Sequence, residues 1–96
     1  MKVITVIFGD AENATPRNTQ KYCFRTKSDV KPGDKLRSRD YNHDMTVMDV
    51  LDKDYKYYHA DTGDLSNEIT STRCWPIKTL EVVKLNDSVT YASIIK

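Results

Sequence analysis

Two histidines and several aspartates are the side chains of this sequence that could hold a metal ion. His43, Asp44, His59 and Asp61 combine imidazole with carboxylate, and these two ligand types can share a divalent cation. Their spacing is not diagnostic of a metal site, and the acidic residues lack the ligand order of a calcium loop. Both histidines have polar neighbours in the sequence, which is typical of solvated side chains. The sequence therefore assigns neither a metal nor any other cofactor.

The triplet Asp61-Thr62-Gly63 has the residue types of the catalytic triplet of retroviral-type aspartic proteases, in which two carboxylates share a proton. Those enzymes place the triplet in an apolar strand, followed by a small residue. Here His59-Ala60 precedes the triplet and Asp64 follows it. Because Asp, Thr and Gly are ordinary turn formers, the triplet predicts a tight turn. No catalytic residue is assigned.

The cysteines are the strongest nucleophiles in the chain, and they are lone residues more than fifty positions apart. Cys23 lies between Tyr22 and Phe24, and Cys74 precedes Trp75, so each is expected to be a small, reduced residue of the core. A cysteine or serine enzyme also needs a base and an orienting partner, and nothing near either residue identifies one. The expectation is a protein that is not an enzyme.

Charge is unevenly distributed along the chain. Seven basic and two acidic residues lie between Gln20 and Arg39, a balance of about +5. On strands, one solvent face of this segment could attract phosphates and release counterions, with Tyr41, Tyr55, Tyr57 or Tyr58 as stacking surfaces. The alternative interpretation is a merely solvating face. The residues expected to bind nucleic acid are Lys21, Arg25, Lys35, Arg37 and Arg39.

The next segment has the opposite charge. Seven aspartates oppose two lysines between Asp40 and Asp64, a balance of about −5. Tyrosine is favoured at interface centres, and aspartates would guide approach to a basic partner. This segment therefore predicts, as an alternative, a surface for a protein partner. Its expected residues are Tyr55, Tyr57, Tyr58, Asp52 and Asp54.

The chain has 96 residues, 39% of them hydrophobic and 30% charged, which predicts one domain over residues 1–96 with a thin core. Its apolar runs are far shorter than the roughly 20 residues that cross a bilayer, and the N-terminus lacks the pattern of an export signal. We therefore expect no membrane span and a cytoplasmic location. Oligomeric state is not indicated.

Strand patterns dominate the sequence. The Pro-Gly pair within Lys31-Pro32-Gly33-Asp34 predicts a type II turn, and 11–19 reads as a loop. Residues 44–52 fit either a helix or a strand, and we favour a strand because β-branched residues are frequent there and the aromatic segment 55–59 follows. The other predicted strands are 2–8, 20–26, 35–39, 68–73, 79–85 and 89–95, with Asn86-Asp87 as a hairpin tip.

This layout resembles a family of short, mostly uncharacterised proteins encoded by bacteriophages and mobile elements of Gram-positive bacteria. The resemblance lies in the aromatic strand before Lys31-Pro32-Gly33-Asp34 and in the segments 46–51, 60–67 and 80–83. It implies an all-β fold, a five- to six-stranded SH3-like or related barrel, and it transfers no catalytic residues. Together with the charge pattern, it implies a binding module whose partner is nucleic acid or, alternatively, a host protein that it inhibits.

Overall fold

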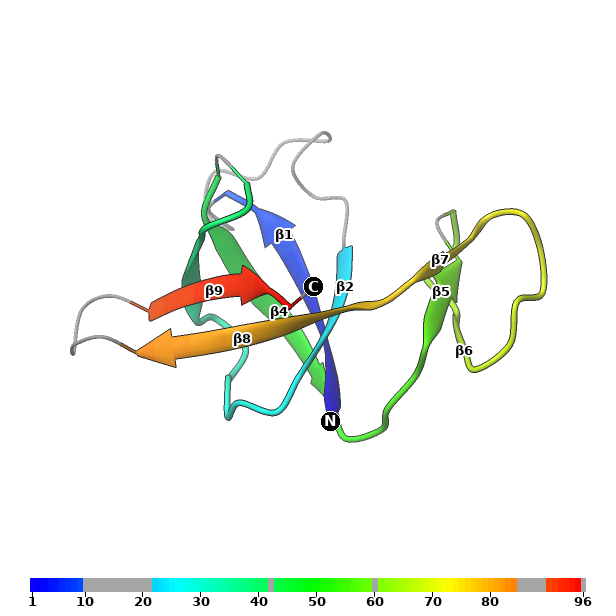
Figure 1. The fold of residues 1–96 in the computed structure, drawn as a ribbon, viewed down its shortest axis with the longest axis horizontal. Coiled ribbons are helices and arrows are strands. Elements are labelled where there is room, and N and C mark those ends of the chain that lie inside the picture. Colours follow the sequence, from blue (N-terminus) through cyan, green and yellow to red (C-terminus); the bar gives the residue numbers. More distant parts are fainter. Residues whose placement is uncertain (10–21, 42, 60, 85–89, 96) are drawn as a thin grey trace.

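The computed structural model describes residues 1–9, 22–41, 43–59, 61–84 and 90–95, and its regular elements are all strands. Six strands form a closed barrel and three form a small separate sheet. In Figure 1 the small sheet, with β5, β6 and β7, lies to one side of the barrel. The predicted all-β small barrel is therefore confirmed. The strands are β1 (Lys2–Phe8), β2 (Tyr22–Thr26), β3 (Lys35–Ser38), β4 (Met45–Leu51), β5 (Tyr57–His59), β6 (Leu65–Ser66), β7 (Cys74–Pro76), β8 (Lys78–Lys84) and β9 (Thr90–Ile94).

The barrel follows the closed order β1-β2-β8-β9-β3-β4. Two of its seams are parallel: β2 pairs with β8 from Phe24 opposite Lys78, and β3 pairs with β9 from Arg37 opposite Tyr91. The other four seams are antiparallel. In this ring β2 and β3 are three strands apart in either direction, so they lie on opposite sides of the barrel.

The barrel interior follows from the period-two alternation of its strands. Ile4 and Val6 of β1 point inward, as does Leu36 of β3, while the exposed Lys35 and Arg37 flank Leu36 as predicted. A β-bulge beside Thr5 and Val6 adjusts the pairing of β1 with β4. The buried residues of this core are Ile4, Val6, Phe24, Val30, Leu36, Met45, Val47, Leu80 and Ala92.

A second, smaller core lies outside the barrel wall. Val3 and Cys23 point outward from β1 and β2, and they contact Tyr58 and Ile77. The predicted burial of Cys23 is confirmed. Figure 1 shows why the two parts meet: β7 and β8 form one nearly continuous extended segment that begins in the small sheet and ends in the barrel. The Ile77 N–H between them donates to the Lys56 carbonyl at 2.8 Å.

Two of the predicted turns are present in the described residues. The Asp34 N–H donates to the Lys31 carbonyl at 3.0 Å, and Gly33 has a φ of 92°, as a type II turn requires. The turn at Asp61-Thr62-Gly63 is also confirmed, because the Gly63 N–H donates to the His59 carbonyl at 2.8 Å. Its Asp61 carboxylate is exposed and accepts hydrogen bonds from the Arg73 guanidinium at 2.6 and 3.1 Å. The Arg73 contact lowers the pKa of Asp61.

Within the segment 44–52, Met45–Leu51 form strand β4, as favoured, but the predicted strand over 68–73 is wrong. Hydrogen bonds between serine hydroxyls and backbone N–H groups two residues later fold that segment into turns instead. The Ser66 hydroxyl accepts from the Glu68 N–H at 3.0 Å, and the Ser71 hydroxyl accepts from the Arg73 N–H at 3.1 Å. The predicted loop 11–19 and the hairpin tip Asn86-Asp87 lie outside the described residues.

Two further findings bear on the sequence analysis. In the described part of the chain no helix is both long and apolar enough for a membrane span. Over the same residues, no group of three or more His, Cys, Asp or Glu side chains is placed to hold a metal ion.

Candidate binding groove

The basic residues predicted to bind nucleic acid do not share one face. Arg25 lies on β2, whereas Lys35 and Arg37 lie on β3 at the opposite side of the barrel, and Arg39 follows β3. The expectation of a joint surface is therefore wrong, because the order of strands separates its members. Lys21 lies outside the described residues.

Several of these cations also have local partners. The Arg25 guanidinium donates two hydrogen bonds to the Asp54 carboxylate, each at 2.6 Å. This contact lowers the pKa of Asp54 and raises the pKa of Arg25. Arg37 lies 3.9 Å from Asp44, and the Arg39 guanidinium lies 4.8 Å from the centre of the Tyr91 ring. Positive charge on this barrel is thus distributed and partly neutralised.

The acidic segment is also less accessible to a protein partner than its sequence implies. Tyr58 is only 8% exposed and belongs to the second core, where burial raises its pKa to about 12. Little of its side chain is therefore available to a protein partner, and its expected role as such a contact stays a prediction. Tyr55 packs against the same core, and Asp54 is engaged by Arg25. Tyr57 is half-buried and Asp52 is exposed.

A groove opens where the small sheet leaves the barrel. β2 and β8 pair from Phe24 and Lys78 onward, whereas the chain just before Lys78 belongs to β7 of the small sheet. The start of β2 and the end of β7 therefore diverge and leave a concave site of about 290 Å³. The residues that line it are Tyr22, Cys23, Phe24, Tyr41, Tyr58, Trp75, Pro76 and Lys78.

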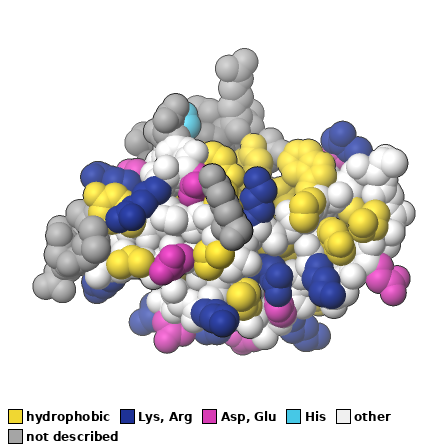
Figure 2. Space-filling model, in the orientation of Figure 1, with side chains coloured by type: hydrophobic (Ala, Val, Ile, Leu, Met, Phe, Trp, Pro, Cys, Tyr) yellow, Lys and Arg dark blue, Asp and Glu magenta, His cyan; other side chains and the backbone are white. Residues whose placement is uncertain are grey.

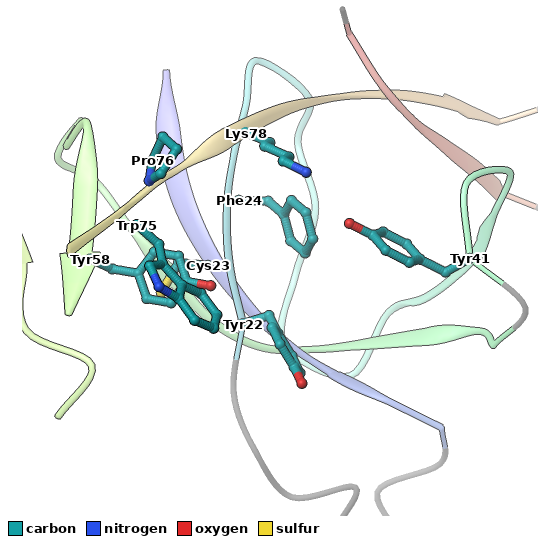
Figure 3. A pocket seen from close by; sticks show the side chains of 8 residues that line it. All are labelled: Tyr22, Cys23, Phe24, Tyr41, Tyr58, Trp75, Pro76 and Lys78. Carbon is teal, nitrogen blue, oxygen red and sulfur yellow. The ribbon is translucent and has the colours of Figure 1, made fainter. Parts of the chain in front are cut away.

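We call this site the aromatic groove, because aromatic rings lie at both of its ends (Figure 3). At one end Trp75 meets Tyr58 edge to face, with ring centres 5.9 Å apart. At the other end Tyr41 packs against Phe8 at 5.0 Å, and Phe8 packs against Tyr22 at 5.1 Å. The two outermost rings remain accessible, since Trp75 is 41% exposed and Tyr41 is 38% exposed.

The loop that carries Tyr41 is fixed by hydrogen bonds. The Ser38 hydroxyl accepts from the N–H groups of Asp40 and Tyr41, at 3.1 and 2.9 Å. The Asp40 carboxylate accepts from the Ile94 N–H of β9 at 2.7 Å. Desolvation and, to a smaller extent, the Asp40 charge raise the pKa of Tyr41. The ring is therefore held in place and neutral near pH 7.

The charge of the groove is simple. Among its eight described lining residues, Lys78 is the charged one and no carboxylate is present. Figure 3 shows Lys78 beside Phe24, between Trp75 at one end and Tyr41 at the other. In Figure 2, hydrophobic side chains gather on the side of the molecule where the small sheet lies, with Lys and Arg side chains beside them. The groove thus offers π faces and a central cation.

Cys74 neighbours this groove without lining it. Its predicted place in the core is wrong: the residue is half-buried, and its sulfur lies 3.2 Å from the Thr70 hydroxyl and 3.9 Å from that of Ser71. These contacts, led by the Thr70 hydroxyl, lower the pKa of the thiol to about 7. Asp61 and His59 of the nearby turn do not contact the thiol in any described hydrogen bond.

Of the four tyrosines that the sequence offered as stacking residues, Tyr41 and Tyr58 line the groove and the other two do not. Sequence reasoning missed Trp75, Pro76 and Lys78. These three residues carry no motif, and they approach β2 only through the parallel seam with β8. The signal that was available is weak: a Trp-Pro pair on a short segment beside a cysteine.

The fold and the groove together define a small closed β-barrel with an attached three-stranded sheet and an aromatic cleft between them. Comparisons of the chain with protein-family models, curated proteins and solved structures found no match.

Proposed function

We propose that this protein is a small, non-enzymatic binding module whose ligand lies in the aromatic groove. The observation that supports this most is the lining itself: five aromatic residues from four segments of the chain converge on one concave site. Concave, mostly apolar sites with a few polar groups are the usual form of ligand sites in proteins. The resemblance to phage and mobile-element proteins remains a prediction.

The size of the groove limits what it accepts. Its volume of about 290 Å³ is at the lower end of typical ligand pockets, which start near 300 Å³. Such a site accommodates a flat ring or a short length of an extended chain. We therefore favour a polymer that places one or two units in the groove.

The surfaces suggested by charge alone receive less support. The cations of the basic segment are divided between opposite sides of the barrel, and Arg25 is tied to Asp54. The alternative of a host-protein inhibitor that uses the acidic segment loses Tyr58 to the second core. The aromatic groove has neither problem, because its residues meet in one place and its outer rings are exposed.

Trp75 provides a direct test, since it is the single tryptophan of the chain. Its fluorescence should respond in a saturable way when a ligand enters the groove. The panel contains short single-stranded DNA and RNA, duplex DNA and a proline-rich peptide. Tyr41→Ala should weaken the response, whereas Ile69→Ala, which removes a 68% exposed side chain outside the groove lining, should not. If no member of the panel changes the fluorescence, or if Tyr41→Ala binds as the parent does, the groove is not the binding surface.

A further inference from the structure

We propose that the aromatic groove binds single-stranded nucleic acid, with bases on the rings of Trp75 and Tyr41 and a phosphate at Lys78. This inference rests on the proposed function, and it names the chemical class of the ligand. Three features of the groove support it: the two accessible rings, the charge between them, and the residue types of its lining.

The first feature is the pair of accessible rings. Trp75 and Tyr41 are each about two-fifths exposed although each also contacts another aromatic ring edge to face. Tyr58 supports Trp75, and Phe8 supports Tyr41. Aromatic rings that are held rigidly and left open are the stacking surfaces of single-strand-binding proteins, because every base has a π face. In a duplex those faces are already stacked, so the site selects unpaired bases.

The second feature is charge. Lys78 is the charged residue among the described lining residues, and none of the other seven carries a carboxylate that would repel a phosphate. Because Lys78 pairs with Phe24 at the start of the parallel seam, its backbone is fixed at the middle of the groove. A base at each end would therefore place the intervening backbone near the ammonium group. This complementarity favours a polyanion, which has a negative charge at every unit, over a proline-rich peptide, whose repeating backbone is uncharged.

The third feature concerns reading of sequence. The described lining offers rings and one lysine but no Arg, Asn, Gln, Asp or Glu, the side chains that usually read base edges, so it should stack bases without discriminating strongly among them. We therefore expect similar affinity for oligothymidylate and for mixed-sequence single strands. Arg39 lies two positions before Tyr41 with its guanidinium on the Tyr91 ring, and it supplies a further positive charge in that part of the chain.

The test is fluorescence anisotropy of labelled oligothymidylate, oligouridylate and duplex DNA across a salt series. Single strands should bind and the duplex should bind more weakly. Tyr41→Ala and Trp75→Ala should each weaken binding by about 5- to 150-fold, as expected for loss of one stacked base. Trp75→Phe should restore part of the affinity and thereby show that Trp75→Ala acts through the ring.

The role of Lys78 is tested by the salt dependence of the binding affinity. Lys78→Ala should reduce the slope of log affinity against log salt by about 0.7, the contribution of one phosphate contact on a single strand. The matched control is Lys31→Ala, which removes an exposed lysine from the turn before β3 and should leave the slope unchanged. Circular dichroism of each variant checks that the barrel is retained.

The outcomes separate the two proposals. If no nucleic acid binds but the proline-rich peptide perturbs Trp75, the nucleic-acid inference is overturned and the binding module stands. If neither ligand perturbs Trp75, both proposals fail. If oligonucleotides bind equally well to the parent, Tyr41→Ala and Trp75→Ala, the nucleic-acid surface lies elsewhere and the inference is again overturned.

Discussion

The barrel and the small sheet differ in how each keeps its apolar residues from water. The barrel closes on itself, so its aliphatic interior is surrounded by its own six strands. The small sheet has the open order β6-β5-β7 and strands of two or three residues, and it contacts the outer face of the barrel through Tyr58 and Ile77. A sheet this small does not bury enough surface to fold alone. The barrel is therefore the scaffold, and the small sheet depends on it.

This difference matters for the groove because each part supplies one wall. Tyr22, Phe24 and Tyr41 come from the barrel, while Trp75 and Pro76 come from the small sheet. The separation of the walls therefore depends on how firmly the sheet is attached. Substitutions that distinguish the two regions also test whether the groove is rigid.

The largest effect is expected for Leu36→Ala in the barrel core. Leu36 is 1% exposed, and truncation of a buried leucine costs about 2–5 kcal/mol of unfolding free energy. Leu51→Ala, at a leucine that is 36% exposed, should cost less than about 0.5–1 kcal/mol. Urea denaturation followed by circular dichroism measures both. Equal losses would show that the barrel interior does not dominate stability.

A smaller and more local effect is expected for Tyr58→Ala. The ring joins the small sheet to Val3 and Cys23, and it supports Trp75. We expect a loss of about 1–3 kcal/mol, confined largely to the small sheet. Amide hydrogen exchange should then accelerate in β5 and β7 but not in β1 and β4. Tyr58→Phe, which keeps the ring, is the control. Faster exchange throughout the molecule would mean that the two regions unfold as one unit.

The ion pair between Arg25 and Asp54 should contribute less. Asp54 is 40% exposed, so solvent screens the pair, and a double-mutant cycle should give a coupling of about 0.5–1 kcal/mol that decreases with salt. Because Arg25 lowers the folded pKa of Asp54, this coupling is complete above the ordinary pKa of 3.8. It is lost as the pH falls through the lowered value. A coupling that persists in strong acid would contradict this assignment.

The smallest expected effect is a change in the reactivity of the cysteine thiols, which differs between the two regions. Cys74, on the small sheet, should react with iodoacetamide with a midpoint near pH 7, because the Thr70 hydroxyl stabilises its thiolate. Cys23 is buried under that sheet and should react slowly. Thr70→Val should move the Cys74 midpoint upward, whereas Thr72→Val, at an exposed neighbour, should not. Peptide mass spectrometry measures each rate. Equal reactivity of the two thiols would indicate that the sheet detaches readily.

Local patterns were sufficient to predict most of the barrel. The strand over 2–8 and the position of Leu36 between two exposed cations follow from alternation, and the turn at Pro32-Gly33 follows from backbone geometry. The segment 68–73 was misjudged because serine side chains bond to nearby N–H groups and divert the chain into turns. The period-two pattern records only which side chains are apolar. It does not show where a serine side chain competes with a strand partner for a backbone N–H group.

The candidate site was harder to predict because it depends on the order of strands. Alternation places Arg25 and Arg37 on outer faces, but it does not say that β2 and β3 are on opposite sides of the barrel. It also gives no reason to bring Trp75 toward Tyr22 and Tyr41, which lie far away in the sequence. Only the parallel pairing of β2 with β8 creates that proximity.

The same parallel seams have a consequence for how the chain reaches its fold. In each seam the paired residues are more than fifty positions apart, and β9 must insert between β8 and β3 before the barrel can close. Such non-local pairing is associated with slow folding, in the range of milliseconds to seconds for small β proteins. Until the C-terminal hairpin arrives, β2 and β3 each present an unpaired edge, where association with other chains can begin. The aromatic groove, which requires the seam at Phe24 and Lys78, is therefore among the last features to form.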